Sequence, residues 1–263
     1  MGCCSVYGNR TYRKWVSEGG SGLRVFELTR GQSNMQVSCE GPLEMLADAS
    51  LSMARREIEA VIEGPGGGRF ASSLCPVSMD ADQAPSPVVA EMLRASGAWN
   101  VGPMACVAGA IAERVGRDLG RLSSRVIVEN GGDVFAIAPG DISIALFPGE
   151  RSPFPRRITF TVSARGGVGV CTSSGRFGHS LSFGQADAVV AIAGSGAEAD
   201  AAATAIANSI RAPEDVEAAM SDGALIGRLR GLLVCCGDRI GVGGSVRLDS
   251  AGRGAGTGGR QVV

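Results

Sequence analysis

The sequence predicts an α+β fold in which a mainly antiparallel sheet packs against helices. Short segments with alternating apolar residues cluster between residues 125 and 175, which is typical of neighbouring antiparallel strands. Helical patterns stand before and after this cluster and do not alternate strictly with strands, so a doubly wound parallel sheet fits less well. At 263 residues and 44% hydrophobic content, the chain has ample material for a packed core.

The N-terminal half begins with a predicted hairpin and continues with helices. Residues 23–28 and 35–39 alternate as strands around the turn at residues 30–34. Pro42 opens a helix whose apolar residues recur through Ile62, and the glycine-rich stretch that follows ends it. Three further segments complete this half: an irregular proline-bearing stretch at 74–87, a short helix at 88–96, and a buried helix of small residues at 104–112.

The second half is predicted to contain a meander of short strands and one alanine-rich helix. The expected strands are residues 125–129, 134–138, 142–147, 158–163, 168–175 and 186–192. The alanine-rich helix spans 197–210. We expect one domain over residues 23–249, an N-terminal extension at 1–22, and a disordered glycine-rich tail at 250–263.

Composition excludes several classes of function. Lys and Arg total 25 against 26 for Asp and Glu, so no global field favours nucleic acid or an anionic membrane. The single histidine and the lack of a C-x-x-C motif argue against a zinc site, and the cysteines are expected to be small buried hydrophobes. With no secretory segment and no apolar stretch of about 20 residues, we expect a cytoplasmic protein that does not span a membrane.

Three polar, glycine-bearing segments are candidates for binding an anion. Each follows an apolar strand, where backbone N–H groups and hydroxyls can be presented to a phosphate. Their candidate binding residues are Glu129, Asn130, Gly131, Gly132 and Asp133; Thr172, Ser173, Ser174 and Gly175; and Ser180 and Ser182. The alternative for the first segment is a simple hairpin turn, which Asn-Gly-Gly-Asp predicts well and which is favoured when this segment is taken alone.

A polar stripe on the alanine-rich helix is a candidate metal site. Asp200 and Thr204 are four residues apart and therefore project from one helix face, together with Asn208. A carboxylate and a hydroxyl are hard oxygen ligands of the kind that hold Mg²⁺ beside phosphates. The alternative is an exposed helix edge on which Thr204 bonds back to the carbonyl of residue 200.

His179 is the candidate catalytic residue, because any acid–base step near neutral pH would use the only histidine first. The alternative is a histidine whose hydrogen bonds are satisfied by nearby carbonyls. No G-x-S-x-G elbow, Walker A or G-x-G-x-x-G motif stands in the required strand–loop–helix context.

Five segments stand in order along the chain, at residues 101–105, 128–133, 171–175, 178–187 and 199–205. Together they resemble the ApbE-type flavin transferases (FAD:protein FMN transferases), and more closely an uncharacterised prokaryotic branch related to them. The resemblance implies a single ApbE-like domain with a flavin-nucleotide site, FAD or FMN, along the second and third segments. It also implies Mg²⁺ on Asp200 and Thr204, with a backbone carbonyl near Met104 and Ala105.

Two departures separate this chain from the transferases. The transferases usually carry Lys-Gly where this chain has Ala108 and Gly109. They also carry a run similar to Asp-Pro-Arg-Thr-Gly after the histidine, whereas Ser180 follows His179 here. The leading hypothesis is a Mg²⁺-assisted protein that binds a flavin or other small phosphorylated ligand and transfers or cleaves it. The alternatives are a non-catalytic cofactor carrier or maturation partner, and a structural homodimer.

Overall fold

The computed structural model describes residues 22–147, 154, 158–174 and 184–249. Most of the predicted N-terminal extension and the predicted tail lie outside these residues. The strands are β1 (Arg24–Arg30), β2 (Ser33–Cys39), β3 (Val126–Asn130), β4 (Asp133–Ile137), β5 (Asp141–Leu146), β6 (Ile158–Ser163), β7 (Val168–Ser173), β8 (Ala188–Ala193), β9 (Gly231–Cys236), β10 (Arg239–Gly244) and β11 (Arg247–Leu248). The helices are α1 (Glu44–Glu63), α2 (Gly67–Ser72), η2 (Ala81–Gln83), α3 (Pro87–Trp99), η3 (Pro103–Cys106), α4 (Val107–Leu119), α5 (Gly196–Ser209), α6 (Asp215–Ser221) and α7 (Gly223–Gly227).

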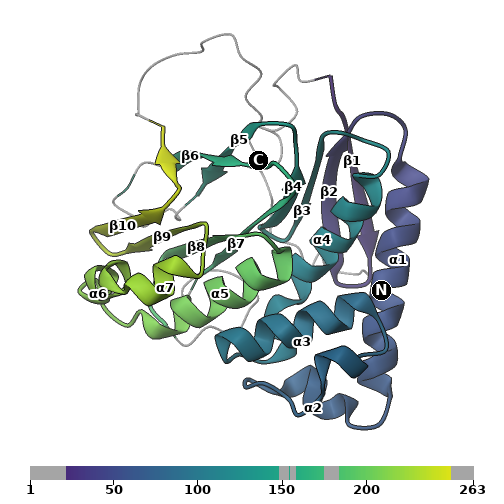
Figure 1. Cartoon of the computed structure of the whole chain (residues 1–263), viewed down its shortest axis with the longest axis horizontal. Coiled ribbons are helices and arrows are strands. Elements are labelled where there is room, and N and C mark those ends of the chain that lie inside the picture. Colours follow the sequence, from purple (N-terminus) through teal and green to yellow (C-terminus); the bar gives the residue numbers. More distant parts are fainter. Residues whose placement is uncertain (1–21, 148–153, 155–157, 175–183, 250–263) are drawn as a thin grey trace, which may run out of the picture.

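The strands form two antiparallel sheets. The large sheet has the order β1-β2-β3-β4-β7-β8-β9-β10, and the small sheet has the order β11-β6-β5. Helices α1, α3, α4 and α5 gather beside the large sheet, while β5 and β6 lie away from them (Figure 1). The α+β prediction with a mainly antiparallel sheet is confirmed.

The central strands of the large sheet, β3, β4, β7, β8 and β9, are buried on both faces, and the alternation of their side chains explains why. Val126 and Val128 of β3 belong to the core shared with the helices, whereas Ile127 between them belongs to the core shared with the small sheet. Successive side chains of a strand point to opposite faces, so each central strand supplies both cores. The result is a layer of helices, a layer formed by the large sheet, and a layer formed by the small sheet.

The predicted single meander is wrong at one point. After β4 the chain leaves the large sheet, forms the β5–β6 hairpin of the small sheet, and returns as β7 beside β4. The small sheet buries one face against the large sheet, as the alternating burial along β6 shows. The sequence alone does not indicate which sheet covers that face. The C-terminal strands β9, β10 and β11 were not predicted, although the apolar run of β9 is a buried-strand signal.

Helix predictions were close to the observed bounds. The helix expected at 88–96 extends over Pro87–Trp99, and the buried helix at 104–112 is a short 3-10 turn, η3, followed by α4. Five described cysteines are buried, as expected for small hydrophobes, namely Cys39, Cys106, Cys171, Cys235 and Cys236, whereas Cys75 is exposed. No helix in the described ranges combines the length and apolar character needed to cross a membrane.

Candidate functional site

The turn between β3 and β4 brings polar side chains to the helix-facing side of the large sheet. Asn130 and Asp133 are directly paired across the two strands, on the same face as Val128 and Phe135. The Asn130 side-chain amide donates a hydrogen bond to the Ala108 carbonyl at 3.1 Å. This bond ties the end of β3 to the first turn of α4.

Asp133 is a buried carboxylate. Its Oδ1 accepts a hydrogen bond from the Thr172 N–H at 3.1 Å. Burial raises the pKa of Asp133 from 3.8 to about 7, and the negative charge of Glu129 adds to this effect, while the Thr172 N–H opposes it. Asp133 can therefore exchange a proton near neutral pH.

Asp200 and Thr204 of α5 lie against the start of α4 and against η3. The Asp200 Oδ2 accepts a hydrogen bond from the Gly109 N–H at 2.9 Å, and the Thr204 hydroxyl donates to the Ala105 carbonyl at 3.4 Å. Thr204 thus bonds across to η3, and the alternative of an exposed helix edge with Thr204 bonded to residue 200 is wrong. The structure thus places Thr204 against the predicted backbone carbonyl, with Asp200 one turn earlier on the same face of α5.

The environment of Asp200 disfavours its charge. Although part of the residue reaches solvent, the surrounding protein atoms and then the charge of Asp133 raise the pKa of Asp200 well above its ordinary value. The N–H groups of the first turn of α4 oppose this rise. The pKa of Asp133 and the pKa of Asp200 are thus each raised in part by the charge of another carboxylate. A bound cation would stabilise the charged form of both side chains.

The donor set fits Mg²⁺. A carboxylate, a hydroxyl and a carbonyl are hard oxygen donors, and Mg²⁺ commonly keeps several waters and completes its shell with substrate phosphate. Among the residues that the structure describes, no three His, Cys, Asp or Glu side chains form a metal-binding group. The candidate site therefore depends on the mixed set of Ala105, Asp200 and Thr204, with the half-buried Met104 beside Ala105 in η3.

The glycine turn is a hairpin turn in the first place. Gly131 and Gly132 have φ angles of 74° and 106°, as a two-residue turn with positive φ requires. The Gly132 N–H donates to Glu129 Oε1 at 2.7 Å. In this conformation Glu129 accepts the Gly132 N–H, and the predicted role of the Gly131–Gly132 backbone in binding a phosphate stays a prediction.

The second predicted binding segment is only partly described. Alternation along β7 places the buried Ser173 on the helix-facing side with Cys171, and Thr172 on the opposite side with Val170. The Ser174 residue is half-buried at the end of the strand. Gly175, His179, Ser180 and Ser182 lie outside the described residues, so their predicted roles stay predictions.

Two residues near the site, Gly109 and Cys171, were not among the predicted site residues. Gly109 supplies the N–H that binds Asp200, and a Cβ at Gly109 would lie 2.2 Å from the Gly196 carbonyl oxygen. Glycine at this position therefore allows the backbones of α4 and α5 to approach closely. Cys171 donates its thiol to the Gly196 carbonyl at 3.4 Å, and burial and then the charge of Asp133 raise the pKa of that thiol well above its ordinary value.

A family model described as AbpE bacteria matches residues 13–225. The chain belongs to this family. The UPF0280 protein of Methanocaldococcus jannaschii is 41% identical over 185 residues, which cover 67% of this chain and 73% of that protein. The UPF0280 protein of Methanopyrus kandleri is 47% identical over 136 residues, 51% of this chain and 54% of that protein. The predicted uncharacterised ApbE-like branch is confirmed.

Solved structures share the fold of this AbpE family member at low sequence identity. The flavin transferase ApbE from Vibrio cholerae superimposes with a TM-score of 0.54 at 11% identity, covering 85% of this chain and 98% of that chain. The apo flavinyl transferase ApbE from Pseudomonas stutzeri has a TM-score of 0.50 at 16% identity, covering 85% and 94%. At these identities the likeness establishes the shared fold.

Proposed function

We propose that this chain binds a flavin nucleotide through Mg²⁺ and transfers or cleaves it at the diphosphate. Support comes from two directions. The solved structures that share the fold carry the names of flavin transferases. The residues of this chain add support, because Thr204 contacts the Ala105 carbonyl and Asp200 lies one turn before Thr204 on the same face of α5.

One observation carries the proposal. Asp200, Thr204 and the Ala105 carbonyl come from α5 and η3, which are far apart in the sequence, and they lie together through the contacts Thr204 to Ala105 and Asp200 to Gly109. A helix whose polar residues served only solubility would present them to water instead. The charge of the neighbouring Asp133 disfavours the charged form of Asp200, and a bound cation would offset this repulsion.

In the proposed reaction the P–O–P bond of FAD breaks. The FMN phosphorus forms a new bond to an acceptor oxygen, from a protein hydroxyl or from water, and AMP leaves with the bridging oxygen. The acceptor oxygen gives up its proton to solvent water. We propose that His179 donates a proton to the leaving AMP and takes one back from solvent. Bound Mg²⁺ would neutralise diphosphate charge. Asp200, Thr204 and the Ala105 carbonyl would hold it, and Asn130 would hold the first turn of α4 in place.

A specific observation favours the carrier alternative. Ala108 stands where the transferases usually carry lysine, and in this structure its carbonyl accepts the Asn130 amide beside the Gly109–Asp200 contact. The first turn of α4 thus brings no side-chain cation to the site at residue 108. A protein that binds the cofactor without cleaving it would need less stabilisation of developing phosphate charge.

Purified protein tests both hypotheses. Mg²⁺ and FAD are titrated by calorimetry into the wild type, Asp200→Asn, and the control Asp48→Asn, which removes a carboxylate from the surface pair with Arg30. Release of FMN and AMP is then followed by chromatography. We expect Asp200→Asn to weaken Mg²⁺ binding at least tenfold and Asp48→Asn to leave it unchanged.

The outcomes separate the hypotheses. Mg²⁺-dependent release of FMN and AMP supports the enzyme, and Mg²⁺-dependent FAD binding without release supports the carrier. If the wild type binds neither Mg²⁺ nor FAD, or if Asp200→Asn binds both as the wild type does, the proposed function is wrong.

A further inference from the structure

Helices α4 and α5 cross with their backbones in direct contact. A Cβ at Gly109 would lie 2.2 Å from the Gly196 carbonyl oxygen, and a Cβ at Gly196 would lie 2.4 Å from the Gly109 carbonyl oxygen. Both distances are far below an ordinary contact, so only glycine fits at either position. The crossing therefore fixes the separation of the two helices at the start of α5, one turn before Asp200 and two turns before Thr204.

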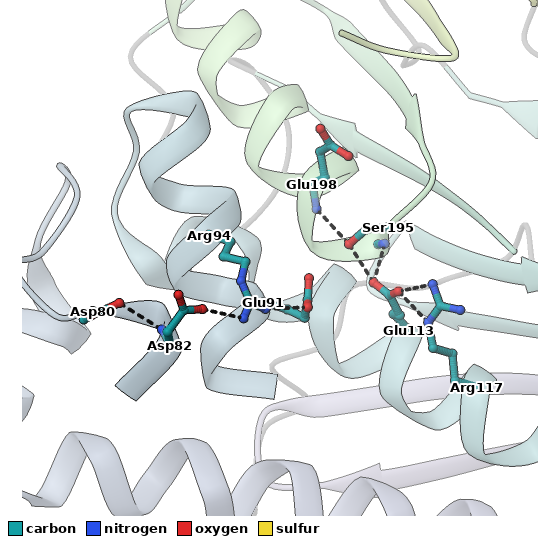
Figure 2. A network of polar contacts seen from close by, with 9 residues as sticks. Asp80, Asp82, Glu91, Arg94, Glu113, Arg117, Ser195 and Glu198 are labelled. Carbon is teal, nitrogen blue, oxygen red and sulfur yellow. Dashed lines mark hydrogen bonds and ion pairs between the residues drawn. The ribbon is translucent and has the colours of Figure 1, made fainter. Parts of the chain in front are cut away.

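At this crossing, one carboxylate on each helix accepts a backbone N–H of the other helix. Glu113 of α4 accepts the Gly196 N–H and the Ser195 hydroxyl with its Oε2, both at 2.7 Å (Figure 2). Asp200 of α5 accepts the Gly109 N–H at 2.9 Å in the opposite direction. The donor and the acceptor are four residues apart on each helix, Gly109 and Glu113 on α4, Gly196 and Asp200 on α5.

Glu113 is built into the fold and is not a surface charge. The residue is buried, and its second oxygen, Oε1, pairs with the half-exposed Arg117 at 2.6 Å (Figure 2). A carboxylate that accepts N–H and O–H groups at the N-terminus of a helix makes strong, charge-assisted hydrogen bonds. Glu113 has no contact with Asp200, Thr204 or Ala105 among the described hydrogen bonds, so any effect it has on them is transmitted through α5.

We propose that Glu113 is a positioning residue, which sets the placement of α5 against α4 and thereby places Asp200 and Thr204 for the metal. The inference rests on the proposed function, since it assumes that these two residues hold Mg²⁺. Mg²⁺ demands near-ideal octahedral geometry, whereas Ca²⁺ accepts six to eight ligands in flexible arrangements. A shift of α5 therefore weakens Mg²⁺ binding more than Ca²⁺ binding.

The test compares three variants with the wild type. Glu113→Leu keeps similar volume and removes both acceptors; Glu113→Gln keeps one acceptor oxygen and is the conservative rescue; Arg117→Gln is the control, because it removes the ion pair and leaves Oε2 for α5. Mg²⁺ and Ca²⁺ are titrated separately into each protein. We expect Mg²⁺ affinity to fall about tenfold in Glu113→Leu and less in Glu113→Gln, Ca²⁺ affinity to fall less than Mg²⁺ affinity, and Arg117→Gln to bind as the wild type does.

A measurement without metal separates this inference from the proposed function. Hydrogen exchange of the Gly109 amide reports its bond to Asp200, and we expect it to accelerate in Glu113→Leu relative to Arg117→Gln. If Glu113→Leu does not fold, Ser195→Ala removes one of the two α5 donors and is expected to accelerate the same amide. If the wild type binds no metal but the amide accelerates, the proposed function fails and the positioning stands. An unchanged amide rate, or equal losses of Mg²⁺ and Ca²⁺ affinity, overturns the positioning role.

Discussion

Asp133→Asn should stabilise the metal-free protein above neutral pH. The amide keeps the shape of the side chain and an oxygen that can accept the Thr172 N–H, which Asp133 accepts at 3.1 Å. It removes a negative charge that is buried and close enough to Glu129 to be disfavoured by it. The substitution therefore tests the electrostatics of the site with little change in packing.

The magnitude follows from the pKa of Asp133, which is raised from 3.8 to about 7. Between these values the folded protein holds a proton that the unfolded chain has lost, so stability falls as pH rises, by about 1.4 kcal/mol per pH unit. The full loss of unfolding free energy caused by the Asp133 charge is about 4 kcal/mol, and it is complete above pH 7. The hydrogen bond from the Thr172 N–H to a neutral amide oxygen is weaker than the bond to a carboxylate by about 1 kcal/mol. The net gain in unfolding free energy of the variant at pH 8 is therefore about 3 kcal/mol.

The assay is urea unfolding of both proteins at pH 5, 6, 7 and 8 with a chelator present. The difference in unfolding free energy cancels the titrating groups that do not interact with Asp133, and it reports Asp133 together with its effect on Asp200 and Cys171. Between pH 5 and pH 8 the wild type is expected to lose about 3 kcal/mol relative to Asp133→Asn. The control Gly97→Ala adds no titratable group and lies in open space on α3, so it should show the same difference from the wild type at every pH. If the Asp133→Asn difference were also constant with pH, the carboxylate would be ionised throughout and the account of a disfavoured charge would be refuted.

Three further substitutions test the packing, the turn and the histidine. Gly109→Ala is expected to cost about 1–3 kcal/mol of stability, because its Cβ would meet the Gly196 carbonyl oxygen at 2.2 Å. The control Gly97→Ala lies in open space on α3 and should gain about 0.5–1 kcal/mol. Equal melting temperatures of the two variants would contradict this. Gly132→Ala should cost about 1–2 kcal/mol in urea unfolding because φ is 106°, and a stability equal to the wild type would show that the turn relaxes. His179→Gln should lose FAD cleavage and keep Mg²⁺ affinity and melting temperature; a lower melting temperature with unchanged cleavage would make this histidine structural.

The sequence was sufficient for the elements whose determinants are local. Positive φ at Gly131 and Gly132 is what Asn-Gly-Gly-Asp requires in a hairpin, and the strands on both sides follow from their apolar alternation. The spacing of Asp200 and Thr204 fixed them to one face of α5, because helical geometry is set within a few residues. Turn geometry and helical spacing depend only on residues within the segment, so the rest of the chain is not needed to predict them.

What those residues meet was decided only by the tertiary structure. Spacing left Asp200 and Thr204 open between a metal site and an exposed edge, and the crossing of α4 and α5 at Gly109 and Gly196 settled that they face η3 and the start of α4. The same is true of β5 and β6, whose alternation revealed one buried face but not the second sheet. Glu113 gave no signal, since its partners Ser195 and Gly196 stand more than 80 residues away along the chain. Burial, and with it the raised pKa of Asp133, depends on how distant segments pack, and local sequence patterns do not contain that information.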